Sequence, residues 1–441
     1  MRNYTSIGVQ VPDLLVPDAT IDHTKWSVIA CDQFTSRVKY WDEVKCIVND
    51  SPSTLHLILP EVYLGKPEEK KIVDESHHFM REYVANRTLK TIEGMVFVER
   101  TTSIGKRYGL ILALDLEQYD YREGSKSLIR ATEGTILERL PPRIRIRENA
   151  PLEIPHIMVL IDDPEKSVIE PIKELISFLP KLYDFDLMLG SGHLKGFLLN
   201  DLSLEKQIIS ALESLASPEI STNKYESIQP NEPMLFAVGD GNHSLATAKS
   251  VWDMKKVQLG MDHPLRYALV EIENIHDEGL VFGSIHRVLF NIDQDMIEAL
   301  NFYFQDSIEI CLCESLSEVI ESVKQNKGRS QKIGLVKGGY QAILSINKPK
   351  SNLAVGSLKG FLDNFLDHND SIYIDYIHDT DAFLEMSQQI NNFGFFLPPM
   401  AKKDLFQTVI LDGALPCKTF SMGEAKDKRF YLECRKIQDI T

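Results

Sequence analysis

The residues best suited to chemistry lie in one short turn between an apolar run and an amphipathic segment. Met234–Val238 is expected to form a buried strand, and His243–Trp252 is expected to form a helix. The turn between them is small and polar, and its residues are Gly239, Asp240, Gly241 and Asn242. A strand that ends in a glycine turn and opens a helix directs free backbone N–H groups and a positive dipole end at one point. Such a point suits a phosphate group; the alternative is a connecting turn with a capping Asn.

Side chains at the mouth of this turn could take part in a reaction. Asp240, Asn242 and His243 carry oxygen and nitrogen atoms that can hold a metal ion or move a proton. A second polar cluster lies upstream and consists of Arg130, Thr132, Glu133 and Thr135. Glu133 is a candidate general base or metal ligand, and a solvated helix start is the alternative for this cluster.

Three arginines follow this cluster at a spacing of two residues. Arg143, Arg145 and Arg147 alternate with isoleucines, and this period predicts an extended strand with all three guanidinium groups on one face. Like charges in a row repel each other, so they need an anion. That anion is either a set of neighbouring Glu or Asp side chains or a phosphate group held by the planar guanidinium forks.

Two candidates for binding the substrate lie nearer the N-terminus. Asp32 follows the apolar run WSVIAC at the end of an expected strand, where α/β proteins place ligand groups. A turn-forming role for this aspartate is the alternative. His56 lies in STLHLIL, which is expected to be an alternating strand, and the alternative to a binding role is a satisfied core histidine.

The elements that must position these residues follow a mixed α/β or α+β pattern. Strands are expected at Met95–Glu99, Tyr108–Leu116, His156–Ile161, Phe197–Leu199, Met234–Val238, Tyr267–Ile272, Lys332–Lys337 and Gln341–Ile346. Helices are expected at Glu68–Asn86, Lys166–Leu179, Leu204–Ala216 and Met296–Phe304, and from Ser315, where Glu318 completes a capping box. A loop is expected over 217–233, and the strand-like stretch 418–436 closes the chain. The predicted domains are 1–290 and a smaller C-terminal α/β domain, 291–441.

Length and charge narrow the classes of function. The 441 residues suggest two or three domains, and a net charge of −16 disfavours binding to nucleic acid or to anionic membranes. The N-terminal region shows no signal peptide, and no run approaches the ~20 apolar residues of a membrane span, so we expect a cytoplasmic location.

Several motifs of known chemistry are missing from the sequence. The six cysteines form no CxxC pair, so free thiols are expected, with Cys311 and Cys313 buried in a strand. No P-loop, GxSxG or HExxH motif occurs.

The chain as a whole resembles the family known as domain of unknown function 1015. The segments that carry the resemblance are PDLLVP to DQF, STLHLILPE, RATEGTILERLPPR, GDGNHSLATA and FFLPP to LPCKTF. Members of that family tend to carry a His-Glu-x-Thr pattern followed by an acidic–Arg pair. Glu133 and Thr135 match this pattern, and Arg143 matches the trailing arginine. The preceding basic position is replaced by Ala131 or Thr132, with Arg130 nearby.

The glycine turn is also similar to the Asp-Gly-His-His-Arg signature of free serine kinases in the ParB/sulfiredoxin superfamily. Asp240, Gly241 and His243 match in place, whereas Asn242 and Ser244 replace the first His and the Arg. The resemblance implies a ParB/sulfiredoxin-like nucleotide-binding core with elaborations. It also implies that the turn and the helix start hold nucleotide phosphates.

Together these observations predict a phosphotransferase that acts on a small hydroxylated metabolite, with free L-serine as the model substrate. The expected co-substrate is ATP or ADP with Mg²⁺ bound by Asp240, and the expected catalytic residues are Asp240, His243 and Glu133. The residues expected to bind phosphate are Gly239, Gly241, Asn242, Ser244, Arg130, Thr135 and Arg143, and those expected to bind the substrate are Asp32 and His56. A phosphoserine hydrolase and a non-catalytic nucleotide-binding regulatory module are the alternatives, and a homo-oligomer is compatible with each.

Overall fold

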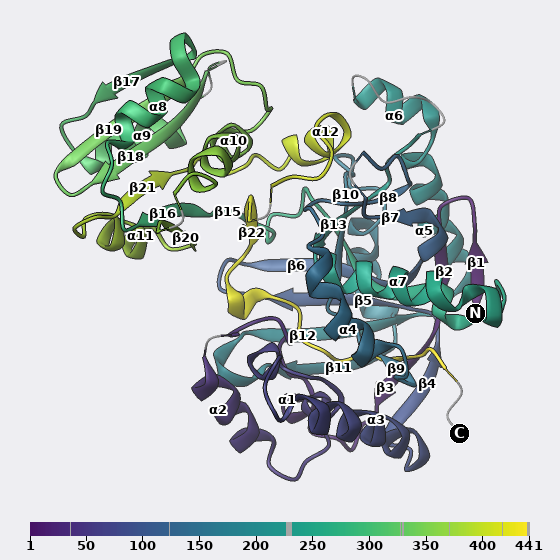
Figure 1. The fold of residues 1–441 in the computed structure, drawn as a ribbon. Helices are drawn as coiled ribbons and strands as arrows, with labels where there is room; N and C mark the ends of the chain where they lie inside the picture. The colour runs from purple at the N-terminus through teal and green to yellow at the C-terminus, as the bar shows by residue number, and fades with distance from the viewer. Residues whose placement is uncertain are drawn as a thin grey trace. The chain divides into compact units, whose positions relative to one another are not determined.

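The computed structural model describes residues 1–35, 37–122, 124–225, 232–326, 328, 330–369, 371–416 and 418–438. The chain forms two compact units, each built around a sheet of its own (Figure 1). The first unit contains Met1–Val281 and the segment that begins at Met422, and the second is Phe282–Ser421. Both units combine strands with helices, which confirms the expected mixed α/β class.

The first unit is built on a large mixed sheet. In space its strands follow the order β11 (Lys181–Asp186), β12 (His193–Leu199), β5 (Met95–Thr101), β6 (Lys106–Asp115), β14 (Tyr267–Asn274), β10 (Met158–Ile161), β13 (Phe236–Asp240), β8 (Ile129–Ala131) and β7 (Tyr119–Asp120). β2 (Val9–Val11) also pairs with β6, and β1 (Arg2–Tyr4) pairs with β2. β13 runs antiparallel to β10 and parallel to β8, so its last residue, Asp240, lies opposite Met158.

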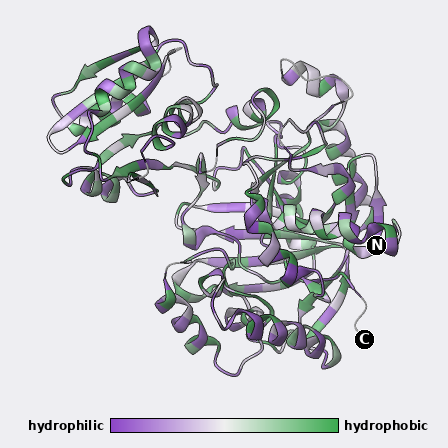
Figure 2. Cartoon of the chain, viewed as in Figure 1, coloured by the Kyte–Doolittle hydropathy of each residue, from purple (hydrophilic) through white to green (hydrophobic). Residues whose placement is uncertain are grey.

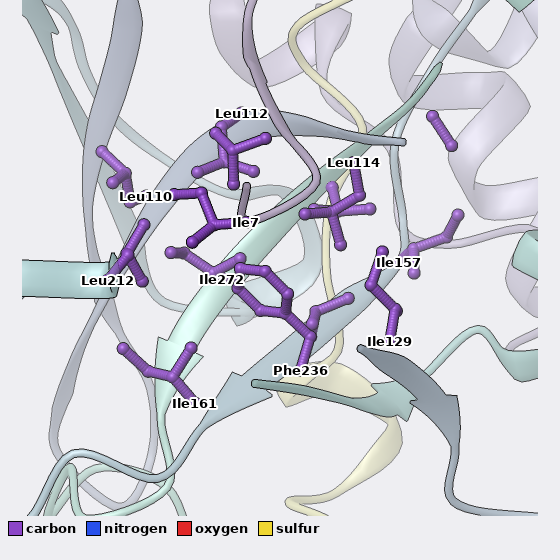
Figure 3. Close-up of a cluster of buried hydrophobic side chains, with 14 of the residues drawn as sticks. Ile7, Leu110, Leu112, Leu114, Ile129, Ile157, Ile161, Leu212, Phe236 and Ile272 are labelled. Atoms are coloured by element: carbon purple, nitrogen blue, oxygen red, sulfur yellow. The ribbon is translucent and has the colours of Figure 1, made fainter. Parts of the chain in front are cut away.

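One face of this sheet packs against α5 (Leu202–Leu215) and α7 (Asn242–Leu259). Aliphatic side chains from neighbouring strands meet there, and Phe236 and Ile272 lie among them (Figure 3). Leu245 and Trp252 of α7 are fully buried in the same cluster, as the helical spacing of the sequence predicts. Packing along the length of α7 therefore fixes the position of its first turn.

The other face packs against the N-terminal helices α1 (His23–Trp26), α2 (Val38–Val48) and α3 (Glu69–Ala85) (Figure 1). The small sheet of β3 (Asp13–Pro17) and β4 (Leu89–Glu93) accompanies these helices. Trp26 and Trp41 are fully buried in this layer. The outer helices carry both hydrophilic and hydrophobic residues along their length, which is the pattern of helices that cover a core on one side only (Figure 2).

The C-terminal segment crosses the first unit and is held there by buried ion pairs. Arg429 pairs with Glu271 of β14 and with Glu433. Arg435, in the short strand β23 (Arg435–Lys436), donates to Glu153 of β9 (Leu152–Glu153) at 2.6 Å. These side chains are nearly inaccessible to water, and buried charges persist only when they are paired. The sequence predicted domains 1–290 and 291–441, whereas the structure groups the segment after Met422 with the first unit. The ionic partners of this segment lie in the first unit.

The second unit contains an antiparallel sheet with helices on both faces. Its strand order is β17 (Ile308–Leu312), β19 (Tyr340–Ile346), β18 (Gln331–Lys337), β21 (Phe393–Phe396), β16 (His286–Phe290) and β20 (Tyr373–Ile377). α8 (Met296–Phe304) and α10 (Ala354–Leu366) cover one face, and α9 (Leu316–Lys324) and α11 (Thr380–Ser387) cover the other. α12 (Asp404–Leu411) follows, and β15 (Phe282–Ser284) pairs with β22 (Phe420–Met422). Ser315 caps α9 as its sequence predicts, by accepting a hydrogen bond from the Glu318 amide at 3.2 Å.

Several segments depart from the predicted secondary structure. Residues 27–31, before Asp32, do not form the expected strand and contribute an isolated bridge at Ile29. Leu140–Arg147 is a helix, α4, and not a strand, because two prolines occupy its first turn, where they are well tolerated, and it packs on α7. Thr54–Leu57 is a short 3-10 helix capped by Ser53, and the expected helix at Lys166–Leu179 reduces to a 3-10 helix over Glu170–Phe178. The alternation of Arg143, Arg145 and Arg147 therefore does not place them on one face.

The loop expected over 217–233 is a helix in its first part. α6 spans Pro218–Lys224 and is capped by Ser217, whereas residues 226–231 lie outside the described residues. Cys417 also lies outside them, and the cysteines that the structure describes are free thiols. Cys311 is exposed, not buried as expected, since β17 is an edge strand. Within the described ranges no helix is long and apolar enough to cross a membrane.

Arg435→Met should destabilise the first unit by about 3 kcal/mol, because it leaves the buried carboxylate of Glu153 short of a partner. The neighbouring exposed Lys436→Met is the matched control and should change stability by less than about 0.5 kcal/mol. Urea unfolding followed by tryptophan fluorescence measures this unit alone, because the three tryptophans of the chain, Trp26, Trp41 and Trp252, all lie in its core. Equal midpoints for the two variants would contradict the ionic anchoring of the segment.

Candidate active site

The turn between β13 and α7 forms as the sequence predicts. β13 ends at Asp240, α7 begins at Asn242, and Gly241 between them has a φ of +82°, which favours glycine. A Cβ atom at Gly239 would lie 2.6 Å from the Met422 sulfur, so close packing requires this glycine as well. The amide of Gly241 donates to Asp240 Oδ1 at 3.1 Å.

Asn242 joins the start of α7 to the segment that follows β8. Its Oδ1 accepts a hydrogen bond from the Thr132 amide at 3.2 Å, and its Nδ2 donates to the Val238 carbonyl at 3.3 Å. The Thr132 hydroxyl donates to the same carbonyl at 2.5 Å. The buried amide of Asn242 is therefore occupied by protein groups, and its role here is to hold two segments together.

This junction brings the two polar segments of the sequence side by side. The Ile136 amide donates to His243 Nε2 at 3.3 Å, so the loop that contains Glu133 and Thr135 runs along the first turn of α7. The Thr135 hydroxyl is buried and has no hydrogen-bond partner among the residues that the structure describes. An unsatisfied buried hydroxyl is costly, so this oxygen marks a position where a ligand atom or a water would be stabilised.

Asp240 forms an ion pair with Lys428 of the C-terminal segment. Lys428 Nζ lies 3.1 Å from Asp240 Oδ2, and the lysine side chain is only 11% exposed. The backbone beside Lys428 pairs with the N-terminal region, since the Ala30 amide donates to the Arg429 carbonyl at 2.9 Å. Three distant parts of the chain thus meet at one carboxylate.

Asp32 lies in the same electrostatic neighbourhood. Burial alone would raise the pKa of Asp32, but nearby His156, a hydrogen bond from Gln33 at 3.1 Å and the charge of Lys428 together lower it. His156 Nδ1 in turn lies 3.0 Å from the Tyr431 hydroxyl. The charge of Lys428 therefore acts on Asp32 as well as on Asp240, its partner in the ion pair.

Arg143 borders this cluster through Glu61. Its guanidinium pairs with the Glu61 carboxylate, and the Glu61 amide donates to the Cys31 carbonyl at 2.8 Å, next to Asp32. Arg145 pairs with Glu69. Arg147 pairs with Glu153. Each arginine has a separate glutamate, which is the first of the two alternatives left open by the sequence.

The remaining predicted residues are engaged in local contacts. Arg130 donates to the carbonyls of Ser127 and Glu232, both at 2.9 Å, and burial lowers its pKa against the effect of Glu232. His56 lies with its ring stacked on Phe79, and its Nδ1 is 2.7 Å from the Tyr83 hydroxyl. Ser244 is half-buried in the first turn of α7.

The donor set does not form a metal site from protein groups alone. Among the described residues, no cluster of three or more His, Cys, Asp or Glu side chains could hold a metal ion. Mg²⁺ is usually bound through one or two carboxylates, with phosphates and water as its other ligands. Asp240 could supply one such carboxylate, because it lies at the turn before α7.

Sequence reasoning missed Lys428, His156 and Tyr431. Lys428 meets the predicted Asp240 only through a long-range ion pair, and Tyr431 and His156 contact each other although they are 275 positions apart. One signal was present, because Arg429, Glu433 and Arg435 interrupt an apolar, strand-like segment with charges. Charges at such positions indicate buried ionic partners.

Solved structures with a similar chain trace are distant from this protein. Free serine kinase in complex with AMP has 10% identity and a TM-score of 0.39, and the match covers 74% of this chain and 92% of that chain. A conserved hypothetical protein from Pyrococcus furiosus has 11% identity and a TM-score of 0.35, and the match covers 71% and 90%. SbnI with a C-terminal truncation, from Staphylococcus aureus, has 9% identity and a TM-score of 0.35, and the match covers 71% and 83%.

No curated protein matches the sequence. The model of one protein family, however, matches residues 15–365, which include Asp32, Glu133, Arg143 and Asp240. The match extends over most of the chain, and the resemblance inferred from the sequence is confirmed. The chain therefore belongs to the family described as protein of unknown function, DUF1015.

Proposed function

We propose that this protein is a phosphotransferase that moves a phosphoryl group between a nucleotide and a small hydroxylated metabolite, with free L-serine as the first substrate to test. The observation that carries the proposal is the ion pair of Asp240 with Lys428 at the glycine turn that opens α7. Phosphoryl transfer depends mainly on positioning and on neutralising charge. A helix start flanked by fixed carboxylates and a cation offers both.

In this proposal the first turn of α7 holds a phosphate group of ATP or ADP. The backbone N–H groups at the start of this long helix have no partner within the helix, and the dipole end is positive. Asp240 would hold Mg²⁺, which supplies positive charge to the phosphate oxygens when bound. The proposal includes a ParB/sulfiredoxin-like core, for which the turn motif is the support.

Glu133 is the stronger candidate for accepting the proton of the substrate hydroxyl. His243 Nε2 already accepts a hydrogen bond from the Ile136 amide, and a neutral imidazole has only one acceptor nitrogen. Glu133 lies half-buried in the adjoining loop, where a carboxylate can act as a general base. We assign His243 the role of fixing that loop against α7.

Asp240→Asn should abolish transfer and leave the fold intact, because it removes the charge that would hold Mg²⁺ without changing the size of the side chain. The assay incubates the protein with ATP or ADP, Mg²⁺ and L-serine and detects O-phosphoserine by ³¹P NMR. Asp253→Asn is the matched control, since Asp253 lies on α7 and pairs only with Lys249 and Lys256 in the described structure. Full activity of the Asp240 variant would refute the assignment.

The same assay separates the alternatives. Hydrolysis of added O-phosphoserine without nucleotide-dependent transfer would favour a phosphoserine hydrolase. Nucleotide binding without either reaction would favour a regulatory module.

Thr135→Val should weaken binding of ADP with Mg²⁺ by about tenfold, which corresponds to about 1.4 kcal/mol, and should not destabilise the protein. The reason is that the Thr135 hydroxyl is buried without a partner in the described structure, so its removal breaks no hydrogen bond within the protein and affects only a bound ligand. Thr132→Val is the contrasting variant, because its hydroxyl donates to the Val238 carbonyl, and its loss should cost about 1–2 kcal/mol of stability. Calorimetric titration and thermal unfolding measure the two effects. Unchanged ADP affinity in the Thr135 variant would remove this hydroxyl from the site.

A further inference from the structure

We infer that Lys428 is the side chain that contacts the phosphate groups of the bound nucleotide, and that it exchanges its ion pair with Asp240 for this contact. This inference rests on the proposed function, because it names a residue of the same site. It assigns a binding role to a segment that lies beyond the residues matched by the family model. The ion pair of 3.1 Å and the burial of the lysine carry the argument.

The backbone on both sides of Lys428 is held in place. Before it, a short 3-10 helix, Ala425–Asp427, is closed by reciprocal capping between Glu424 and Asp427, and Arg107 donates to the Asp427 carbonyl at 2.8 Å. After it, the Arg429 carbonyl accepts a hydrogen bond from the Ala30 amide. Only the side chain of Lys428 is left to move, so its ammonium group is restricted to the region around Asp240.

The other cations near the turn have different partners. Arg143 pairs with Glu61, and Arg130 donates to two backbone carbonyls. Ser244 brings no charge to the first turn of α7. Lys428 is therefore the cation that already lies at the mouth of the turn, and a nearly buried ammonium needs an anionic partner at all times.

The charges explain why the partner would change when nucleotide binds. The ion pair of Lys428 with Asp240 has no net charge, so in this pairing the ammonium offers no excess positive charge to a phosphate group. A divalent cation held by Asp240 would replace Lys428 as the partner of this carboxylate. The ammonium can then donate to a phosphate oxygen, which is a strong charge-assisted contact.

The test uses the full chain and titrates ADP in the presence of Mg²⁺ by calorimetry. Lys428→Met should weaken ADP binding by about 10- to 100-fold, as expected for loss of one hydrogen bond to a charged group. Lys428→Arg retains the charge and should keep most of the affinity. Lys426→Met is the matched control, because Lys426 lies two residues away, is 44% exposed and pairs with Glu424, and its affinity should equal that of the wild type.

A double variant distinguishes contact with phosphate from simple neutralisation of Asp240. The double variant is titrated with ADP in the absence of Mg²⁺, so that loss of the proposed Mg²⁺ ligand does not affect the result. If Lys428 only balanced the charge of Asp240, adding Asp240→Asn to Lys428→Met would restore ADP binding; the inference requires that binding stays weak. Wild-type affinity in Lys428→Met, with the fold verified by tryptophan fluorescence, would overturn it, as would a failure of the wild-type protein to bind ADP. Lys428-dependent binding without O-phosphoserine formation would support the inference and refute the proposed kinase activity. Transfer that is unaffected by Lys428→Met would support the proposed kinase activity and overturn the inference.

Discussion

The first unit depends on the pairing of buried charges along the C-terminal segment. Arg429 lies between Glu271 and Glu433, and Arg435 reaches Glu153, all with side chains that are nearly inaccessible to water. Buried ion pairs add little net stability compared with apolar packing, but breaking one is expensive. Their effect is to fix one register of the segment on the sheet. The positions of the side chains on this segment, including that of Lys428, follow from that register.

The candidate site is a consequence of this register. The pairing of the Arg429 carbonyl with the Ala30 amide fixes the backbone beside Lys428, whose side chain reaches Asp240. A second constraint acts from the sheet, where the buried amide of Asn242 holds the loop after β8 against α7. The site thus combines a rigid helix start with side chains from the two ends of the chain.

The predictions from the sequence were accurate where the local pattern was decisive. β13, the glycine turn and α7 form as expected, because an apolar run, a glycine that needs a positive φ and a helical apolar stripe all indicate the same structure. The arginines of α4 show the opposite case. Their period of two suggested a strand, but Pro141 and Pro142 begin a helix and the packing of α4 on α7 maintains it. Alternation over a few residues is weaker evidence than packing.

The sequence by itself determined the fold class, the phosphate-compatible turn and the association of Glu133, Thr135 and Arg143 in one family pattern. Local periodicity, glycine geometry and motif spacing encode these features, so they can be recognised without coordinates. The tertiary structure alone decided that Lys428 pairs with Asp240, that the arginines of α4 pair with three different glutamates, and that the Thr135 hydroxyl is buried without a partner in the described residues. Such contacts depend on strand register and on burial, which no local pattern specifies.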